Sequence, residues 1–539
     1  MTLSTLRAAA ATLAVAGAPI CGQALDPQAF HVVSRTSFGH TLPILQAASQ
    51  PGGIAAYLQA QLNPAAGDNA TATALVNSLG TITTLDELQQ LQAVLACFSD
   101  HQLREVMTQF WERHFNTNFG RIRQVVLAFG GTDPDAVAFE AESNALFRQH
   151  ALGTFYDLLV ASSLGRAMNA YLNLFANKIP IPNEDFAREC LELHTVGLKN
   201  LANQDNYTHN DIEALASCFS GVSLWRSSLP GNLITFPASP TALQRVFIAD
   251  WHDYNSKVLF GGGGPIPQLM IAAQPQNSAL GQRDAYTVLW FLANADATKE
   301  FVCDKLIRFF LGDDANEPTL RTQCMASWGS NGGDLRAVLT TLLNSSQFQG
   351  TTYRRKRLRN PMEYAVGVVR ALGGTVSAPS DLDALLDTTT NMGMDLFGYP
   401  SPDGFPNDSY EQTGTQIYMD ATGFAKAIHR RGPPYANPPY QGTVAFTLPT
   451  DVATGIGTLV TGGSATNPLH VAEYFLRRMY VDDWNSTDLI KCARLVAQTE
   501  NGLNQGLNVG NPPGSNQDYQ GRIDLLAFLV ASLPQAFKK

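Results

Sequence analysis

Apolar side chains recur every three or four residues through most of the chain, and this spacing limits its fold more than any other feature. LREVMTQFWERHF, AYTVLWFLANADATKEFVCDKLIRFFL and MEYAVGVVRALGG show it. The spacing predicts amphipathic helices. The best strand candidates are RVFIAD (245–250) and TVAFTLP (443–449), a possible hairpin. We therefore predict a mainly α protein, a large multi-helix globular domain with loop-rich insertions and at most a small β-hairpin.

The 539 residues suffice for two or three domains, or for one large domain with insertions. We expect a leader at 1–24, a helical core domain at 25–373, and a loop-rich C-terminal helical region at 374–539, packed on the core. Proline and glycine concentrate in loops at 227–267 and 399–442. Long structured loops are often functional. The glycines at 261–264 lack a following Lys-Ser/Thr, so we discount a phosphate loop.

The charge of the chain argues against a nucleic-acid partner. The formal net charge is -10, with 36 Lys and Arg against 46 Asp and Glu. Nucleic-acid binders usually carry a basic patch. The basic run RRKRLR (354–359) is short and reads better as a solvated helix start. In the mature chain, no apolar run is long enough to span a membrane.

The first 24 residues read as an export signal. Arg7 precedes a short apolar stretch, AAAATLAVAGAPI, and GQA (22–24) suits a signal peptidase that cuts before Leu25. Cys21 allows a lipoprotein reading, but Ala18-Pro19-Ile20 is a poor lipobox. We expect an exported protein, periplasmic or extracellular after removal of the leader.

Cysteine spacing argues against a zinc ribbon. Six of the seven cysteines would remain after cleavage, and none stand in CxxC pairs. An oxidising compartment permits disulfides. Cys303 and Cys324 are the closest pair in sequence and are the predicted disulfide. The others are expected to be buried thiols on helices.

The stretch PNEDFARECLELHTVGL (182–198) concentrates charge in a chain that is only 15% charged. Asn183 suits a helix N-cap and Gly197 a helix stop, which predicts a helix over 184–196. At ~100° per residue, His194 faces inward and Glu192 lies ~200° away, so the two do not form a simple chelating pair. The plainer interpretation is a capped helix with a surface salt ladder and a hydrogen-bonded core histidine.

Other histidines also stand on inward helical faces. His114 and His150 each lie three or four residues from large apolar side chains, and His252 stands in the loop DWHDYNSK with Asp253 and Lys257. A lone inward histidine is usually a satisfied core group, and the loop could be an ordinary turn. Three inward histidines could instead converge to ligate a metal or transfer protons.

Eight blocks in order resemble a large bacterial family, the domain of unknown function 1800, from about residue 31 to 428. They include HVVSRTSFGHT, MTQFWERHFNTN, PNEDFARECLELHTVG, YTHNDIEALASCFSGVSLW, HDYNSKVLFG and GYPSPDGFPN. The resemblance implies an exported bacterial protein, often encoded beside a phosphatase/sulfatase-like exported protein. It implies no established activity.

Carried over block by block, the family signature gives two sets of candidate residues. The catalytic candidates are Arg188, Glu189, Glu192, His194, Asp253 and Lys257. The metal-ligand candidates are Glu112, His114, His194 and His252. The chain departs from the family at Glu112 (often histidine), at Asn173 (often aspartate) and in residues 222–225, which loosen a Thr-Gly-Trp ending. Glutamate still ligates zinc or iron, so Glu112 keeps a metal site open.

Two functions of different classes follow. The first is a metal-dependent or acid–base enzyme, a hydrolase being one form, that acts on an extracellular polymer or its breakdown products; a divalent metal is its candidate cofactor, and an iron or copper oxidoreductase stays open. The second is a non-catalytic assembly partner for the phosphatase/sulfatase-like protein. A serine hydrolase is weaker, because the chain has no G-x-S-x-G and Ser220-Gly221 lacks the elbow context.

Overall fold

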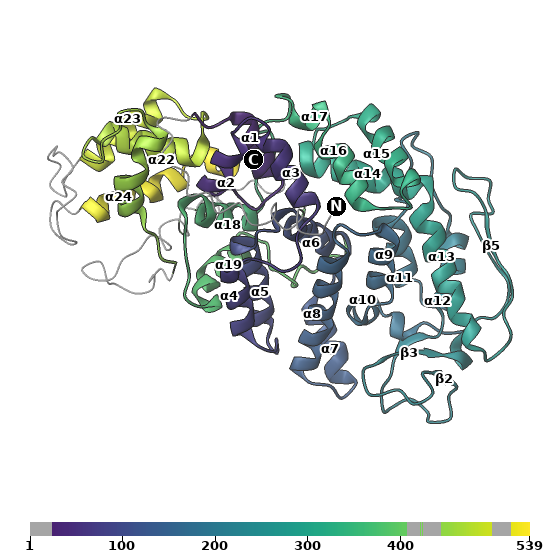
Figure 1. Cartoon of the computed structure of the whole chain (residues 1–539). Helices are drawn as coiled ribbons and strands as arrows, with labels where there is room; N and C mark the ends of the chain where they lie inside the picture. The colour runs from purple at the N-terminus through teal and green to yellow at the C-terminus, as the bar shows by residue number, and fades with distance from the viewer. Residues whose placement is uncertain (1–23, 407–420, 422, 424–443, 498–518) are drawn as a thin grey trace, which may run out of the picture.

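The computed structural model describes residues 24–406, 421, 423, 444–497 and 519–539, and it is mainly α (Figure 1). The predicted leader falls almost entirely outside the described residues. The central helices include α6 and α8, while α22 to α24 lie at one end of the molecule and α12 and α13 at the other. Within the described ranges, no helix is long and apolar enough to cross a membrane.

The first part of the chain is a series of short helices joined by tight turns. They are α1 (Pro27–Arg35), α2 (Leu42–Ala48), α3 (Gly53–Leu62), α4 (Ala70–Leu79), α5 (Leu85–Phe98), α6 (Gln102–His114), α7 (Phe119–Ala128), α8 (Asp133–His150), α9 (Phe155–Ser163), α10 (Arg166–Tyr171), α11 (Asp185–Glu189) and α12 (His209–Phe219). Polar N-caps start several of them. Thr84 and Glu87, for example, form a reciprocal capping box at α5.

The second part is also helical. Its helices are α13 (Gln282–Asn294), α14 (Asp296–Leu311), α15 (Pro318–Ser330), α16 (Leu335–Leu343), α17 (Ser346–Gln349), α18 (Pro361–Leu372), α19 (Asp383–Asn391), α21 (Leu448–Leu459), α22 (Pro468–Tyr480), α23 (Ser486–Ala497) and α24 (Tyr519–Ala531). Helix α18 contacts α5, α19 and α22, and so links the two parts of the chain.

Helix α18 is buried along its whole length. It is apolar on every side except for a few charges, a pattern typical of a helix enclosed by others. Its Glu363 is buried and pairs with Arg357 (Nη1 to Oε1, 2.9 Å) and with Lys539 (Nζ to Oε1, 2.6 Å). These two cations hold the pKa of Glu363 below its ordinary value even though burial opposes them. Glu363 is therefore a charged group inside the core.

The strands form two small antiparallel sheets. The first has the order β1 (Val222–Leu224), β3 (Arg245–Ile248), β2 (Thr235–Phe236), and the second pairs β4 (Lys257–Leu259) with β5 (Leu269–Ile271). The predicted strand at 245–250 is thus present as β3. The predicted strand at 443–449 is wrong for its described residues, because Ala445 makes only an isolated bridge to Thr375 and α21 begins at Leu448. The expected hairpin between the two segments does not form.

The predicted disulfide is also wrong: Cys303 and Cys324 are both free, as are the other described cysteines. The two thiols lie on the packed helices α14 and α15, and burial and then Cys324 raise the pKa of Cys303. Burial likewise raises the pKa of Cys324 to about 12. The six described cysteines are buried, as expected for unreactive thiols.

The C-terminal helices contact the rest of the fold. The Tyr364 hydroxyl of α18 donates to the Ala531 carbonyl of α24 at 3.1 Å, and its ring stacks on Phe537 at 4.6 Å. Gly373 ends α18 in the left-handed conformation (φ 72°). The domain boundary placed there stays a prediction.

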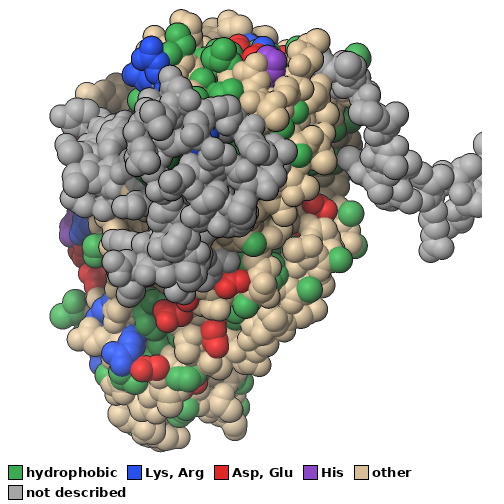
Figure 2. Space-filling model, turned by 90° about the vertical axis from the view of Figure 1, so that its left-hand side faces the viewer, with side chains coloured by type: hydrophobic (Ala, Val, Ile, Leu, Met, Phe, Trp, Pro, Cys, Tyr) green, Lys and Arg blue, Asp and Glu red, His purple; other side chains and the backbone are tan. Residues whose placement is uncertain are grey.

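Charged side chains are scattered over the face drawn in Figure 2. On its described part, small groups of Lys and Arg stand among acidic and uncharged residues and form no continuous basic surface. This distribution is unlike the basic stripe typical of nucleic-acid binders.

A close approach of two backbones gives a stability test. A Cβ added at Gly39 would lie 2.5 Å from the Cα of Gly367 on α18. We expect Gly39→Ala to lower the free energy of unfolding by about 1–3 kcal/mol, because neither backbone can move without disturbing the core. Thermal or urea unfolding measures it.

Gly329 on α15 supplies the control, since a Cβ there meets nothing within 4 Å. Gly329→Ala should be neutral or slightly stabilising, as alanine favours helix over glycine. Equal unfolding midpoints for the two variants would contradict the close-packing argument.

Candidate functional site

The charged stretch at 182–198 is not a single α-helix. Helix α11 covers Asp185–Glu189, and the chain then widens into one π-helical turn, Cys190–His194. Glu184, not Asn183, is the capping position, although the Asn183 carboxamide oxygen accepts the Asp185 N–H at 3.1 Å. Isolated π turns inside helices are frequent at functional sites.

The ends of this stretch otherwise follow the sequence. Gly197 has φ 72° and its N–H donates to the Leu191 carbonyl at 2.9 Å, so it stops the helix as predicted. A Cβ there would lie 2.8 Å from the Phe301 ring of α14. Most of the predicted inward face is buried, namely Phe186, Ala187, Cys190, Leu191 and His194.

His194 is fully buried at the end of the π turn, and neither ring nitrogen has a hydrogen-bond partner among the described residues. Its ring packs against Phe115 (ring centroids 5.2 Å apart) and lies 6.2 Å from the ring of His114. Burial and then Lys305 lower its pKa to about 3, so the imidazole is neutral. Orphaned buried imidazole nitrogens are costly and are uncommon in a purely structural core.

His114, at the end of α6, is held by both of its nitrogens. Nε2 lies 3.0 Å from the His194 carbonyl oxygen, and Nδ1 lies 3.0 Å from Nζ of Lys305. A carbonyl only accepts and an ammonium only donates, so Nε2 carries the proton and Nδ1 is the acceptor. Burial, Lys305 and His194 lower the pKa of His114 well below its ordinary value. Its one lone pair is therefore already engaged.

Lys305 of α14 is the residue that sequence reasoning missed. It is partly buried, and burial and then the Arg113 guanidinium lower its pKa to about 8, against the opposing effect of Asp403. Its Nζ also lies 5.3 Å from the centre of the Phe301 ring. A signal was present: Lys305 stands three residues after Val302 and four before Phe309, on an otherwise apolar stripe.

Glu189 is the last residue of α11 and Glu192 lies in the π turn, on the same stretch of chain as His194. Both are half-buried, and neither forms an ion pair with a described residue. Burial and then the like charge of Glu192 raise the pKa of Glu189. Burial and Glu192 also raise the pKa of Tyr207 to about 12. Arg188 points elsewhere and forms an exposed pair with Glu184 (2.9 Å), which contributes little stability.

The loop that follows α19 closes over the end of α6. The Arg113 side chain donates to the carbonyls of Phe405 and Pro406 (2.7 Å for the latter), and the Tyr171 hydroxyl donates to Pro400 at 2.9 Å. These bonds place the exposed Asp403 where it affects the pKa of both Lys305 and Glu189. Part of the predicted functional loop at 399–442 therefore lies close enough to Lys305 to affect its pKa. The rest of the loop lies mostly outside the described residues.

Glu112 lies on α6, two residues before His114, but has hydrogen-bond partners of its own. Its Oε1 accepts from the Asn144 amide at 2.9 Å, and burial raises its pKa to about 7. Burial and then Glu112 raise the pKa of Glu140 to about 8, and Thr117 donates to that carboxyl at 2.8 Å. A cavity of about 40 Å³ beside Glu112 and Thr117 has room for a water molecule.

His252, Asp253 and Lys257 belong to a different cluster around Asp284, in which all but the half-buried Asp253 are buried. His252 Nδ1 lies 2.7 Å from the Ser220 carbonyl oxygen and Nε2 lies 3.3 Å from Asp284 Oδ2, which also pairs with Lys257 at 2.8 Å. A Cβ on Gly281 would lie 2.6 Å from the His252 ring. The cluster is enclosed and its main groups are paired, as in a structural site.

Ser220 in the same cluster has its hydroxyl 3.3 Å from His252 Nδ1, but its other bonds do not suit a nucleophile. It is buried, its hydroxyl donates to the Ser217 carbonyl at 2.7 Å, and it accepts the Asp253 N–H at 2.9 Å. The Nδ1 proton of His252 is bonded to the Ser220 carbonyl, so His252 cannot serve the hydroxyl as a base from that nitrogen.

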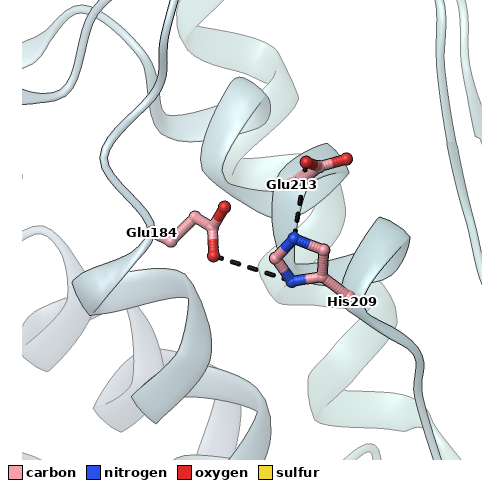
Figure 3. Close-up of side chains that lie close together, drawn as sticks. All are labelled: Glu184, His209 and Glu213. Atoms are coloured by element: carbon pink, nitrogen blue, oxygen red, sulfur yellow. Dashed lines mark ion pairs between the residues drawn. The ribbon is translucent and has the colours of Figure 1, made fainter.

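The metal-ligand candidates are not brought together as a set, because His252 lies in the second cluster. Among the residues the structure describes, the group with metal-ligand spacing is Glu184, His209 and Glu213, whose ligand atoms all lie within 4.8 Å of one another (Figure 3). His209 Nδ1 is 3.8 Å from Glu184 and Nε2 is 3.5 Å from Glu213. The group is largely exposed and Arg188 already pairs with Glu184, so it is a weaker cation site than its residue types suggest.

These features define a mainly α, multi-helix protein in which His114, His194 and Lys305 meet at the end of a π-helical turn. The chain belongs to the family described as Protein of unknown function (DUF1800), whose model matches residues 31–533. The match confirms the resemblance and extends beyond residue 428. No curated protein and no solved structure gives a significant match.

The lowered pKa of Lys305 predicts a pH-dependent stability. Between about pH 8 and 10.5 the unfolded chain binds more protons at this lysine than the folded one, so stability rises with pH. We expect the free energy of unfolding of the wild type to increase relative to that of Lys305→Met by up to about 3 kcal/mol over this range. Urea unfolding of both proteins at pH 7 and pH 10 measures it.

Lys199 is the matched control, since it is exposed and pairs on the surface with Asp205 at 2.8 Å. Lys199→Met should follow the wild type at both pH values. A constant difference between the wild type and Lys305→Met would show that the Lys305 pKa is not lowered.

Proposed function

We propose that this chain is an exported acid–base enzyme that hydrolyses or otherwise modifies an extracellular polymer, with Glu189 as base and Lys305 as acid. One observation carries the proposal. A partly buried lysine with a pKa of about 8 donates to a neutral histidine, and the Asp403 carboxyl acts on the pKa of both this lysine and the half-buried Glu189. Perturbed groups of opposite type in one place are typical of proton-transfer sites.

The mechanism requires an ionised Glu189 and a protonated Lys305. Glu189 has a raised pKa yet is ionised once the pH exceeds it, so it can take a proton from water or from a substrate hydroxyl. Lys305 stays protonated up to about pH 8 and can give a proton to the leaving group. General acid–base catalysis of this kind contributes typically about 10²–10⁴-fold to the rate.

The neighbouring groups position these two. His114 accepts one Lys305 proton at 3.0 Å and leaves the other two free for the substrate or Asp403. The His194 carbonyl fixes the orientation of His114 through Nε2, and Glu192 raises the pKa of Glu189 by like-charge repulsion. His194 thus acts through its backbone, while Asp253 and Lys257 take no part in the proposed chemistry.

A metal-dependent form of the enzyme has less support than the acid–base form. A metal on His114 would have to displace Lys305 from Nδ1, since Nε2 is bonded to the His194 carbonyl. Export would leave the structure around the expected cleavage point in place. Leu25 would become the first residue, and Asp26 caps α1 by accepting the Gln28 N–H at 2.8 Å, so removal of the leader leaves the first helix intact.

The test of the proposal is the pH profile of hydrolysis. The mature chain, from Leu25 onward, is assayed on a panel of extracellular polysaccharides for released reducing ends. We expect kcat/KM to rise with pH as Glu189 ionises and to fall above about pH 8 as Lys305 loses its proton. Glu189→Gln and Lys305→Met should each lose about 10²-fold or more in kcat.

Two further variants test the role of Lys305, and two other results would favour a different function. Lys305→Arg should move the alkaline limb to higher pH, and Lys199→Met should leave activity unchanged. About one transition metal per chain by elemental analysis, lost in both His114→Ala and His194→Ala while they stay folded, would replace the acid–base mechanism by a metal-dependent one. No activity on any polymer, with recovery of a phosphatase/sulfatase-like protein by the mature chain, would favour the assembly role.

A further inference from the structure

Two large aromatic side chains are exposed on the outer face of α13. Trp290 is 58% exposed and Tyr286 is 37% exposed. They stand four residues apart and so share one face of the helix. Tyr156 of the adjoining α9 lies beside them, since burial and then Tyr286 raise its pKa. Exposed tryptophan and tyrosine rings in one group are typical of a binding surface.

A cavity of about 330 Å³ adjoins these aromatic side chains, and Tyr286 forms part of its wall. Gln282, one turn before Tyr286, also lines it. The first sheet contributes Phe236 and Arg245, and Gln244 lines it from the residue before β3. Its volume is at the lower end for small-molecule sites. Gln282, Tyr286 and Trp290 follow one another at four-residue intervals, so the surface runs along roughly 12 Å of helix, from the cavity wall to Trp290.

The charge in this cavity is a single cation without an acidic partner. Arg245 is the one charged side chain of the lining; it is exposed, and it forms no ion pair with any described residue. Its guanidinium is 3.5 Å from the Leu164 carbonyl oxygen. Guanidinium groups bind carboxylates through two parallel hydrogen bonds, while glutamine amides bind hydroxyls.

We propose that this surface binds an acidic oligosaccharide, a sugar chain that contains uronic acids. The uronate carboxylate pairs with Arg245 in the cavity, the sugar hydroxyls meet the amides of Gln244 and Gln282, and the apolar faces of the sugar rings lie on Tyr286 and Trp290. No residue of the Glu189–Lys305 centre lines this cavity. The binding surface is therefore separate from the proposed catalytic centre and does not depend on the chemistry proposed there.

Isothermal titration calorimetry of the mature chain tests the inference with four soluble probes. Three are hexamers that contain galacturonate, mannuronate or glucuronate, and the fourth is the neutral cellohexaose. We expect at least one acidic hexamer to bind at least tenfold more tightly than cellohexaose. Trp290→Ala and Tyr286→Ala should each weaken that binding at least tenfold, and Arg245→Gln should remove the preference for the acidic probe.

Ile490→Ala is the control, because Ile490 is 45% exposed on α23 at the other end of the molecule. It should bind like the wild type. Absence of binding to all three acidic hexamers, equal binding of cellohexaose, or binding that survives both aromatic substitutions would each overturn the inference. Glu189→Gln should bind the acidic hexamer as the wild type does, so failure of the catalytic proposal would leave this result unchanged.

Discussion

The packing of the fold depends on the buried ion pairs that Glu363 forms with Arg357 and Lys539. Helix α18 is enclosed on all sides, and Glu363 in its first turn is compensated by Arg357 and Lys539 at 2.9 and 2.6 Å. Loss of one partner from a buried pair typically costs about 3–5 kcal/mol. Because Lys539 follows α24 in the chain while α18 contacts α5, this ion pair joins the last described helices to the first ones.

The polar groups around His114 and Lys305 are brought together by the packing of the helices. Its groups come from α6, α14, the π-helical turn and the loop after α19, which are far apart in the sequence. Two of them are held by bonds to the backbone of another segment: His114 by the His194 carbonyl, and Arg113 by the carbonyls of Phe405 and Pro406. Because these bonds fix one backbone segment relative to another, they also fix the positions of the side chains. A pre-organised site requires such fixed positions.

The sequence predicted the helical class and the inward position of His114 and His194, because both follow from the 3.6-residue period and the apolar neighbours of each histidine. It did not reveal that His252 lies in a separate cluster, since that is decided by the tertiary contact with Asp284. Lys305 was missed because a lysine in an apolar helix is ordinarily read as a solvated group. The prediction of a disulfide between Cys303 and Cys324 was wrong because closeness in sequence does not decide the geometry of two thiols.

In the π-helical turn, the number of residues as well as their type determines where the side chains point. A π turn closes its hydrogen bonds over five residues where an α-helix uses four. Deletion of a single residue between Cys190 and His194 would let the α-helical ladder continue, and each later side chain would rotate by about 100°. His194 would then leave the core, and its carbonyl would no longer meet His114. In related chains, an insertion or deletion here would therefore alter the centre more than most substitutions.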